Sequence, residues 1–230
     1  MDTRSELLNR PLGLERSAEA TVYALLGVAF ALTAVGVFVG MLFFEAIFSS
    51  GMHIALLIAE LAILFTANLW VRRSPLNMLL FGLFPFLSGL TFAPYVIAVL
   101  AGYANGGSIL LNALLSTALM VMAAAICARG LGWNLSSIGG SLFFALIGLI
   151  ILSLLQLFIP GLRTTGFELL LSGIGIVLFS LFTAYDLQRM RGQLQLGMSP
   201  FLIALSLYLD IYNLFLSILR FMMALSGQRR

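Results

Sequence analysis

Five polar residues recur at helical spacing inside the otherwise apolar stretch from Ala204 to Phe221. They are Ser206, Asp210, Asn213, Ser217 and Arg220, and steps of three or four residues put them on one face of an α-helix. A carboxylate in the middle of a bilayer costs several kcal/mol, so this face is expected to point toward other helices or a water-filled cavity. Asp210 is therefore the first candidate for a functional residue.

A second carboxylate, Asp186, lies on the preceding apolar stretch, in TAYDLQRMR. Ser199 and Pro200 predict the N-cap and first residue of the last helix, which puts Asp210 about 15 Å along that helix, near mid-membrane. Asp186 is expected at the cytosolic end of its helix, where the macrodipole is unfavourable and a carboxylate needs a cation or a shared proton. If the last helix begins lower or bends, the two aspartates meet. Two carboxylates in a low-dielectric site share one proton, which predicts a pH sensor without histidine.

The whole chain has the composition of a membrane protein. Of its 230 residues, 61% are hydrophobic and 9% are charged, and the mean hydropathy is +1.10, so a soluble surface is missing. Seven apolar stretches are each long enough to cross about 30 Å of hydrocarbon. They are Val22–Phe44, Ile54–Val71, Leu76–Gly102, Ser108–Ala128, Ile138–Ile159, Phe167–Leu187 and Phe201–Leu225.

This pattern predicts an all-α membrane protein with seven transmembrane helices. Residues 22–225 form a single membrane domain, and the short connections leave no room for a soluble one. Residues 1–21 are expected to be a polar cytosolic N-terminal tail rather than a signal peptide, because no short apolar core with a small-residue cleavage site follows. Residues 226–230 are expected to be a short polar C-terminal tail.

The arginines predict the orientation. All twelve basic residues are Arg, and they fall near the expected helix ends, which does not indicate nucleic-acid binding. Eight lie in segments on the side of the N-terminus and three in segments on the other side, so the positive-inside rule puts the N-terminus in the cytoplasm. The absence of lysine excludes a retinal Schiff base. The single Cys127 excludes an internal disulfide.

The ending of the chain resembles a known family. FTAYDLQRMR, followed about twenty residues later by ALSLYLDIYNLFLSILRF, resembles the bacterial branch of the Bax inhibitor family, the transmembrane Bax-inhibitor-motif proteins, and the resemblance covers the whole chain. It implies a pH-sensitive calcium-leak channel whose last helix is surrounded by the other six. It also implies that Asp186 and Asp210 are the family's aspartate pair, the pH sensor and gate. Glu60 matches its acidic residue in the second span, and Arg72 or Arg73 matches the arginine that latches onto the sixth-span aspartate.

Oxygen chemistry agrees with that implied function. Calcium takes oxygen ligands, and we expect the cation pathway to use Glu60, Asp210 and Asn213, with Ser206, Ser217 and Arg220 as supporting polar residues. So few carboxylates predict transient, weak Ca²⁺ occupancy at Asp186 and Asp210. No tightly bound cofactor is expected. The expected surroundings are the lipid bilayer of a bacterial inner membrane and permeant Ca²⁺, with the chain acting as a monomer.

Two other function classes stay open. A non-conducting regulator would bind another membrane protein, such as a membrane-bound protease, and would pass no ions. An intramembrane aspartyl protease also uses two aspartates on consecutive helices, and Tyr185-Asp186 matches its first dipeptide. Its second aspartate follows Gly-x-Gly, however, whereas Asp210 follows Leu-Tyr-Leu. We therefore expect the chain not to be an enzyme.

Overall fold

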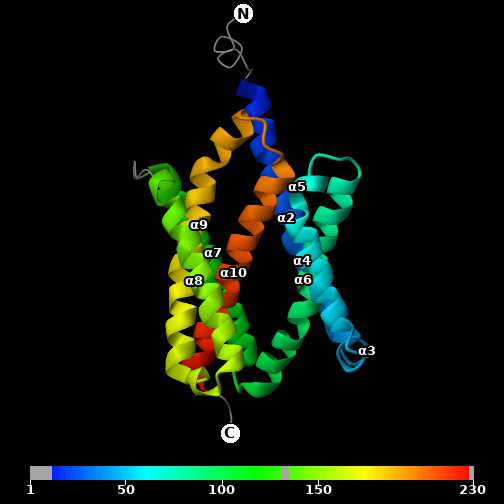
Figure 1. Ribbon diagram of the computed structural model, residues 1–230, viewed down its shortest axis with the longest axis vertical. Helices are drawn as coiled ribbons and strands as arrows, with labels where there is room; N and C mark the ends of the chain where they lie inside the picture. The colour runs from blue at the N-terminus through cyan, green and yellow to red at the C-terminus, as the bar shows by residue number, and fades with distance from the viewer. Residues whose placement is uncertain (1–11, 131–134, 228–230) are drawn as a thin grey trace, which may run out of the picture. The chain divides into compact units, whose positions relative to one another are not determined.

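The structure is a computed structural model that describes residues 12–130 and 135–227 (Figure 1). Within these ranges the chain folds into helices and contains no strand. The α-helices are α2 (Leu12–Leu42), α3 (Phe44–Ser49), α4 (Met52–Phe65), α5 (Ala67–Trp70), α6 (Leu76–Gly102), α7 (Gly106–Gly130), α8 (Gly139–Phe158), α9 (Thr165–Gln195) and α10 (Pro200–Ser226). Two short 3₁₀ helices, η1 (Leu135–Ile138) and η2 (Pro160–Leu162), precede α8 and α9.

Among the described residues, six helices are long and apolar enough to cross a membrane: α2 from Ala18 onward, α6, α7, α8, α9 and α10. Their outward side chains are apolar as well. Phe144 and Phe158 of α8, for example, are 74% and 78% exposed. A protein that leaves such large aromatic side chains uncovered needs lipid rather than water around it.

The second apolar stretch departs from the sequence prediction. A single span was expected over Ile54–Val71, but α4 ends at Phe65 after 14 residues and α5 follows as a separate turn from Ala67. The helix is interrupted at Thr66, whose hydroxyl donates a hydrogen bond to the carbonyl of Ala62. The indole nitrogen of the buried Trp70 donates to Ile63 O at 3.0 Å, which satisfies a carbonyl near the end of α4. At about 21 Å, α4 alone is shorter than the hydrocarbon layer.

The helices reach into both predicted tails. Helix α2 begins at Leu12, ten residues before the apolar stretch that starts at Val22. The rest of the expected N-terminal tail lies outside the described residues. At the other end α10 continues to Ser226, and residues 228–230 lie outside the described residues.

Helices α9 and α10 are long and continuous (Figure 1). Helix α10 begins at Pro200, as predicted. Helix α9 was expected to leave the membrane at Leu187, yet it runs on to Gln195. The added residues QRMRGQLQ are polar, but apart from one glycine they are good helix formers, so the helix outlasts its apolar part. Asp186 is therefore not in the last turn of its helix, and the macrodipole argument made for it from the sequence is wrong.

The contacts divide the chain into two compact units. Unit 1 comprises the residues up to Ala93 together with Arg189–Tyr208, and unit 2 comprises Pro94–Gln188 together with the residues from Leu209 onward. Helices α6, α9 and α10 each contribute one part to each unit.

In unit 1, α2 and α6 approach closely. A methyl group added at Gly36 would collide with the backbone of Phe86 and Gly89, and one added at Gly89 would collide with the backbone of α2 at Thr33. Gly40, four residues after Gly36, would likewise meet Ala93. The sequence pair Gly36–Gly40 thus marks a true helix crossing, of the kind that small residues permit in membranes.

In unit 2, α9 packs against both α8 and α10. A methyl group at Gly139 would meet the ring of Tyr185, and one at Gly175 would meet the hydroxyl of Ser217. Next to Tyr185, Ala184 packs in a small cluster with Ala124 of α7 and Leu135 of η1. The amide of Leu135 also donates to the side chain of Gln188 at 2.8 Å. These contacts fix the stretch of α9 that carries Asp186.

Candidate functional site

Asp186 and Asp210 come together within unit 2. Asp210 is only 9% exposed, Asp186 is half-buried, and a side-chain hydrogen bond joins the two. Ionised carboxylates are acceptors only, so this bond requires that at least one of the two aspartates carry a proton. The Oδ2 atom of Asp210 is buried without a hydrogen-bond partner among the described residues. The site can therefore take up or release a proton or a cation at an oxygen that no protein group occupies.

The meeting of the two aspartates follows from the extension of α9. Asp186 lies nine residues before the end of α9 at Gln195, and Asp210 lies ten residues after the start of α10 at Pro200. At 1.5 Å per residue these offsets are roughly 14 and 15 Å, measured along two helices joined by four residues. The sequence argument found the two aspartates at different depths because it ended α9 at Leu187. No bend in α10 is needed to bring them to the same level.

The other members of the polar stripe lie in different environments. Asn213 is half-buried and donates to Leu209 O at 2.8 Å, and the buried Ser217 donates to Asn213 O at 2.8 Å. Both side chains are thus bonded to the backbone of their own helix. Ser206 is exposed. Arg220 is half-buried and lines a pocket described below.

Glu60 is held by hydroxyl groups within unit 1. The hydroxyl of Thr91 on α6 lies 2.7 Å from Glu60 Oε1, and that of Ser88 lies 3.4 Å from Oε2. Ser88 is also hydrogen-bonded to the buried Tyr208 of α10, whose hydroxyl lies 2.8 Å from that of Thr33 on α2. The result is a polar network that connects four helices around one carboxylate.

Most of this network was missed at the sequence level. Of its members, only Glu60 was singled out from the sequence. Thr91 follows Ser88 by three residues and so lies on the same helix face, which is a signal that the sequence does contain. Thr33 and Tyr208 carry no such signal, because their meeting depends on how α2 and α10 are rotated.

Arg72 and Arg73 follow α5 after one residue, Val71, and are exposed. Among the described residues of unit 1, neither arginine forms an ion pair with a carboxylate. The residue before them, Val71, accepts a hydrogen bond at 3.1 Å from the hydroxyl of Ser199, which immediately precedes α10. The side chain expected to cap α10 thus ties the start of that helix to the segment that carries the two arginines.

The acidic side chains do not form a dense metal cage. Among the described residues, no group of three or more His, Cys, Asp or Glu side chains is close enough to hold a metal ion. The aspartate pair contributes two carboxyl groups, whereas Ca²⁺ takes six to eight oxygen ligands. Any Ca²⁺ at the pair would keep most of its water.

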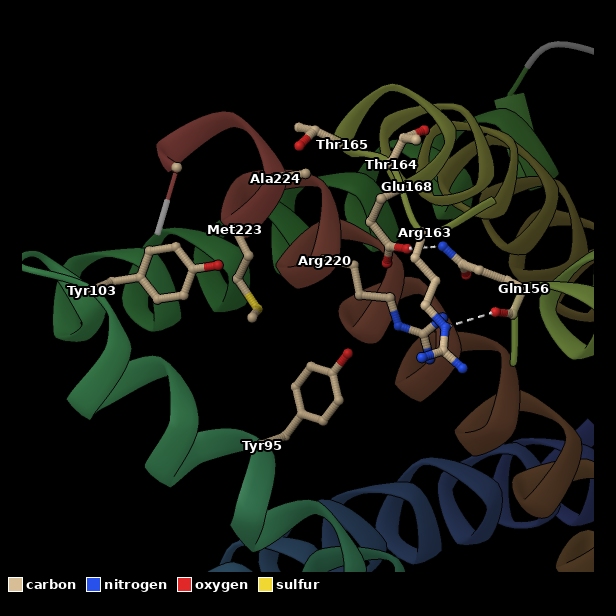
Figure 2. Close-up of a pocket in the computed structure, with 11 residues that line it drawn as sticks. Tyr95, Tyr103, Gln156, Arg163, Thr164, Thr165, Glu168, Arg220, Met223 and Ala224 are labelled. Atoms are coloured by element: carbon tan, nitrogen blue, oxygen red, sulfur yellow. Dashed lines mark hydrogen bonds between the residues drawn. The ribbon is translucent and has the colours of Figure 1, made fainter. Parts of the chain in front are cut away.

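Unit 2 also contains a pocket of about 700 Å³ lined by residues of α6, α8, α9 and α10 and of the connections next to them. Figure 2 shows Arg163 and Arg220 beside the carboxylate of Glu168. Arg163 donates to the backbone carbonyls of Gln156 and Leu157 near the end of α8, and the Gln156 amide donates to Glu168 Oε2 at 2.7 Å. From the sequence, Arg220 was assigned to the polar stripe.

A family model and several bacterial proteins match this chain over most of its length. The family model described as "Inhibitor of apoptosis-promoting Bax1" matches residues 16–227. An uncharacterized protein of Campylobacter jejuni is 31% identical over 221 residues, which cover 93% of each chain. One from Helicobacter pylori is 31% identical over 87% of this chain and 83% of its own. The inner membrane protein YbhL of Escherichia coli is 30% identical over 77% of this chain and 75% of its own. Together with the six long apolar helices among the described residues, these matches show that this multi-pass membrane protein belongs to the Bax inhibitor family.

Proposed function

We propose that the protein is a pH-sensitive calcium-leak channel gated by protonation of Asp186 and Asp210. The observation that carries this proposal is the side-chain hydrogen bond between two acidic residues, one of them buried, on consecutive helices. A structural role alone would be served as well by an amide or a hydroxyl pair, whose hydrogen bonds do not depend on pH. A carboxyl pair makes the contact between α9 and α10 depend on a proton.

Gating follows from what the pair does when that proton leaves. With one proton present, the bond ties α9 to α10. Without it, two like charges remain at short range in a low-dielectric site, where their repulsion is much stronger than in water. The pair then separates or recruits a positive charge. Arg72 or Arg73 would supply that charge in the closed state as a latch, and Ca²⁺ would supply it during permeation.

The proposed cation pathway uses oxygen ligands throughout. Glu60, Asp210 and Asn213 present carboxyl and amide oxygens, and the hydroxyls around Glu60 hold its carboxylate in one orientation. Weak, partly hydrated binding suits a leak, because an ion held by many ligands would leave slowly.

In the membrane, we propose seven spans with the N-terminus in the cytoplasm. Helices α4 and α5 together cover Met52–Trp70, about 28 Å of helical rise. Despite the interruption at Thr66, they would form the second span along the chain and bring the total to seven. The last helix would be central, with the other six around it. The printed name of the Escherichia coli relative supports the inner membrane as the location. We propose that one chain suffices for the leak.

Calcium flux into proteoliposomes across a range of pH tests this function. The purified full-length chain should admit Ca²⁺ with a pH-dependent rate, and Asp186→Asn and Asp210→Asn should each remove that dependence. Glu45→Gln is the matched control, because Glu45 is an exposed acid of α3 outside the proposed pathway, and its profile should match wild type. Wild-type liposomes that pass no Ca²⁺ at any pH would contradict the channel and favour the non-conducting regulator.

A further inference from the structure

The 700 Å³ pocket of unit 2 has walls of two kinds. Arg163, Arg220 and Glu168 are charged, whereas Tyr95, Met223 and Ala224 present aromatic and aliphatic surface. Figure 2 shows the two arginine side chains and Glu168 on one side of the pocket, with Tyr95 and Met223 across from them. The volume is that of a typical site for a small organic ligand, and far more than a single inorganic ion needs.

The charged wall has an excess of positive charge. Two guanidinium groups face one carboxylate, and that carboxylate already accepts a hydrogen bond from Gln156. Among the described residues, neither Arg163 nor Arg220 forms an ion pair. The Nε of Arg220 is buried and has no hydrogen-bond partner among those residues. A buried guanidinium N–H without an acceptor is costly, which indicates that an acceptor from outside the chain completes this wall.

The helix ends at the pocket do not determine whether it prefers an anion or a cation. The N-terminus of α9, at Thr165, favours an anion, but the last turn of α10, at Ala224, favours a cation. These two contributions oppose each other. The side chains therefore determine the preference, and they leave about one unit of positive charge. Guanidinium groups suit planar or tetrahedral oxyanions because each offers several donors in a fixed fork.

We propose that this pocket binds a phosphate ester attached to an apolar group, with the phosphate at Arg163 and Arg220 and the apolar part against Tyr95, Met223 and Ala224. Arg163 uses two of its five donors on backbone carbonyls, so three remain for a ligand. The same chemistry is offered by an anionic phospholipid from the surrounding bilayer and by a soluble organic phosphate. Binding in this pocket is independent of calcium conduction, because a wall with two arginines repels Ca²⁺.

Native mass spectrometry of the full-length chain in detergent tests the lipid source. Phosphatidylglycerol is titrated against diacylglycerol with the same acyl chains, which lacks the phosphate. We expect phosphatidylglycerol to bind at least about tenfold more tightly, and Arg163→Gln and Arg220→Gln each to lose about tenfold in its affinity. Arg191→Gln is the matched control, because Arg191 is exposed, pairs with Glu19 and is outside the pocket, so its affinity should stay unchanged.

Thermal unfolding with added glycerol 3-phosphate or inorganic phosphate tests the soluble source. A rise in Tm for wild type that both pocket variants lose would support the proposal with a soluble ligand. Helical content by circular dichroism, together with the Tm without ligand, shows whether each variant is folded. Arg220→Lys provides a second folded variant that keeps the charge but lacks Nε, and it should bind more weakly than wild type. Equal binding of phosphatidylglycerol and diacylglycerol with no Tm rise, or equal binding by all folded variants, would overturn the proposal.

Discussion

The hydroxyl groups of Thr33 and Tyr208 lie 2.8 Å apart and join α2 to α10 two residues before Asp210. Thr33 also donates to Ala29 O at 2.9 Å, so its single proton is used there and Tyr208 is the donor between the two hydroxyls. The ring of Tyr208 packs against Phe30 and Phe84. The position of α10 in unit 1 therefore depends on one tyrosine through both its ring and its hydroxyl.

Tyr208→Phe should separate these two contributions. It keeps the ring but removes the bond to Thr33, so we expect a loss of roughly 1 kcal/mol in unfolding free energy, since hydrogen bonds in membranes contribute modestly. The measurement is thermal unfolding in detergent. Tyr23→Phe changes a tyrosine that is 38% exposed and should cost less than about half as much. Equal stability of Tyr208→Phe and wild type would show that the ring alone fixes α10.

Substituting the glycine at the crossing of α2 and α6 should destabilise unit 1. Gly36→Ala places a methyl group against the backbone of Phe86, which cannot move aside as a side chain would. We expect a lower Tm and a lower yield of folded protein. Gly27→Ala is the control on the same helix, because nothing lies within 4 Å of the added methyl, and it should be neutral or slightly stabilising through helix propensity. Two equally stable variants would show that the helices separate readily at this crossing.

The proposed latch predicts different behaviour for two neighbouring arginines. If one of them holds Asp186 in the closed state, Arg72→Ala or Arg73→Ala should raise calcium flux in proteoliposomes, and the other should leave it near wild type. Arg129→Ala, at the end of α7, controls for the general loss of a positive charge. Two variants with wild-type flux would remove the latch and leave the aspartate pair to act alone.

A double-mutant cycle tests whether Asp186 and Asp210 act as one unit. Since either amide removes the shared proton, Asp186→Asn, Asp210→Asn and the combined variant should show the same flat pH profile of flux, so the two effects should not add. Additive changes in the flux profile would mean that the two aspartates titrate independently, despite the hydrogen bond that joins them.

The apolar stretches predicted most of the helices, because lipid imposes a length and a composition that can be read directly. Hydropathy marks where lipid ends, however, and not where a helix ends. That is why the polar residues after Leu187 were taken for a loop although α9 continues to Gln195. For the same reason hydropathy did not predict the interruption of the helix at Thr66. That interruption depends on side-chain hydrogen bonds from Thr66 and Trp70 inside an uninterrupted apolar stretch.

Candidate residues were easier to find than their partners. A carboxylate inside an apolar stretch stands out, so Glu60, Asp186 and Asp210 could be singled out from the sequence. The bonds of Glu60 to Ser88 and Thr91 depend on how α4 and α6 are rotated, and hydropathy does not specify that rotation. The pocket at Arg163 and Arg220 combines residues of four helices and of the connections next to them, and the sequence does not show that these residues meet.

The central claim is that Asp186 and Asp210 share a titrating proton, and infrared difference spectroscopy across a pH titration tests it most directly. Wild type should show a protonated-carboxyl band that disappears over the same pH range in which calcium flux changes. Asp186→Asn and Asp210→Asn should each abolish that band, and Glu60→Gln, which changes a carboxyl of unit 1, should retain it. A band that persists in both aspartate variants, or that does not titrate where the flux changes, would contradict the account.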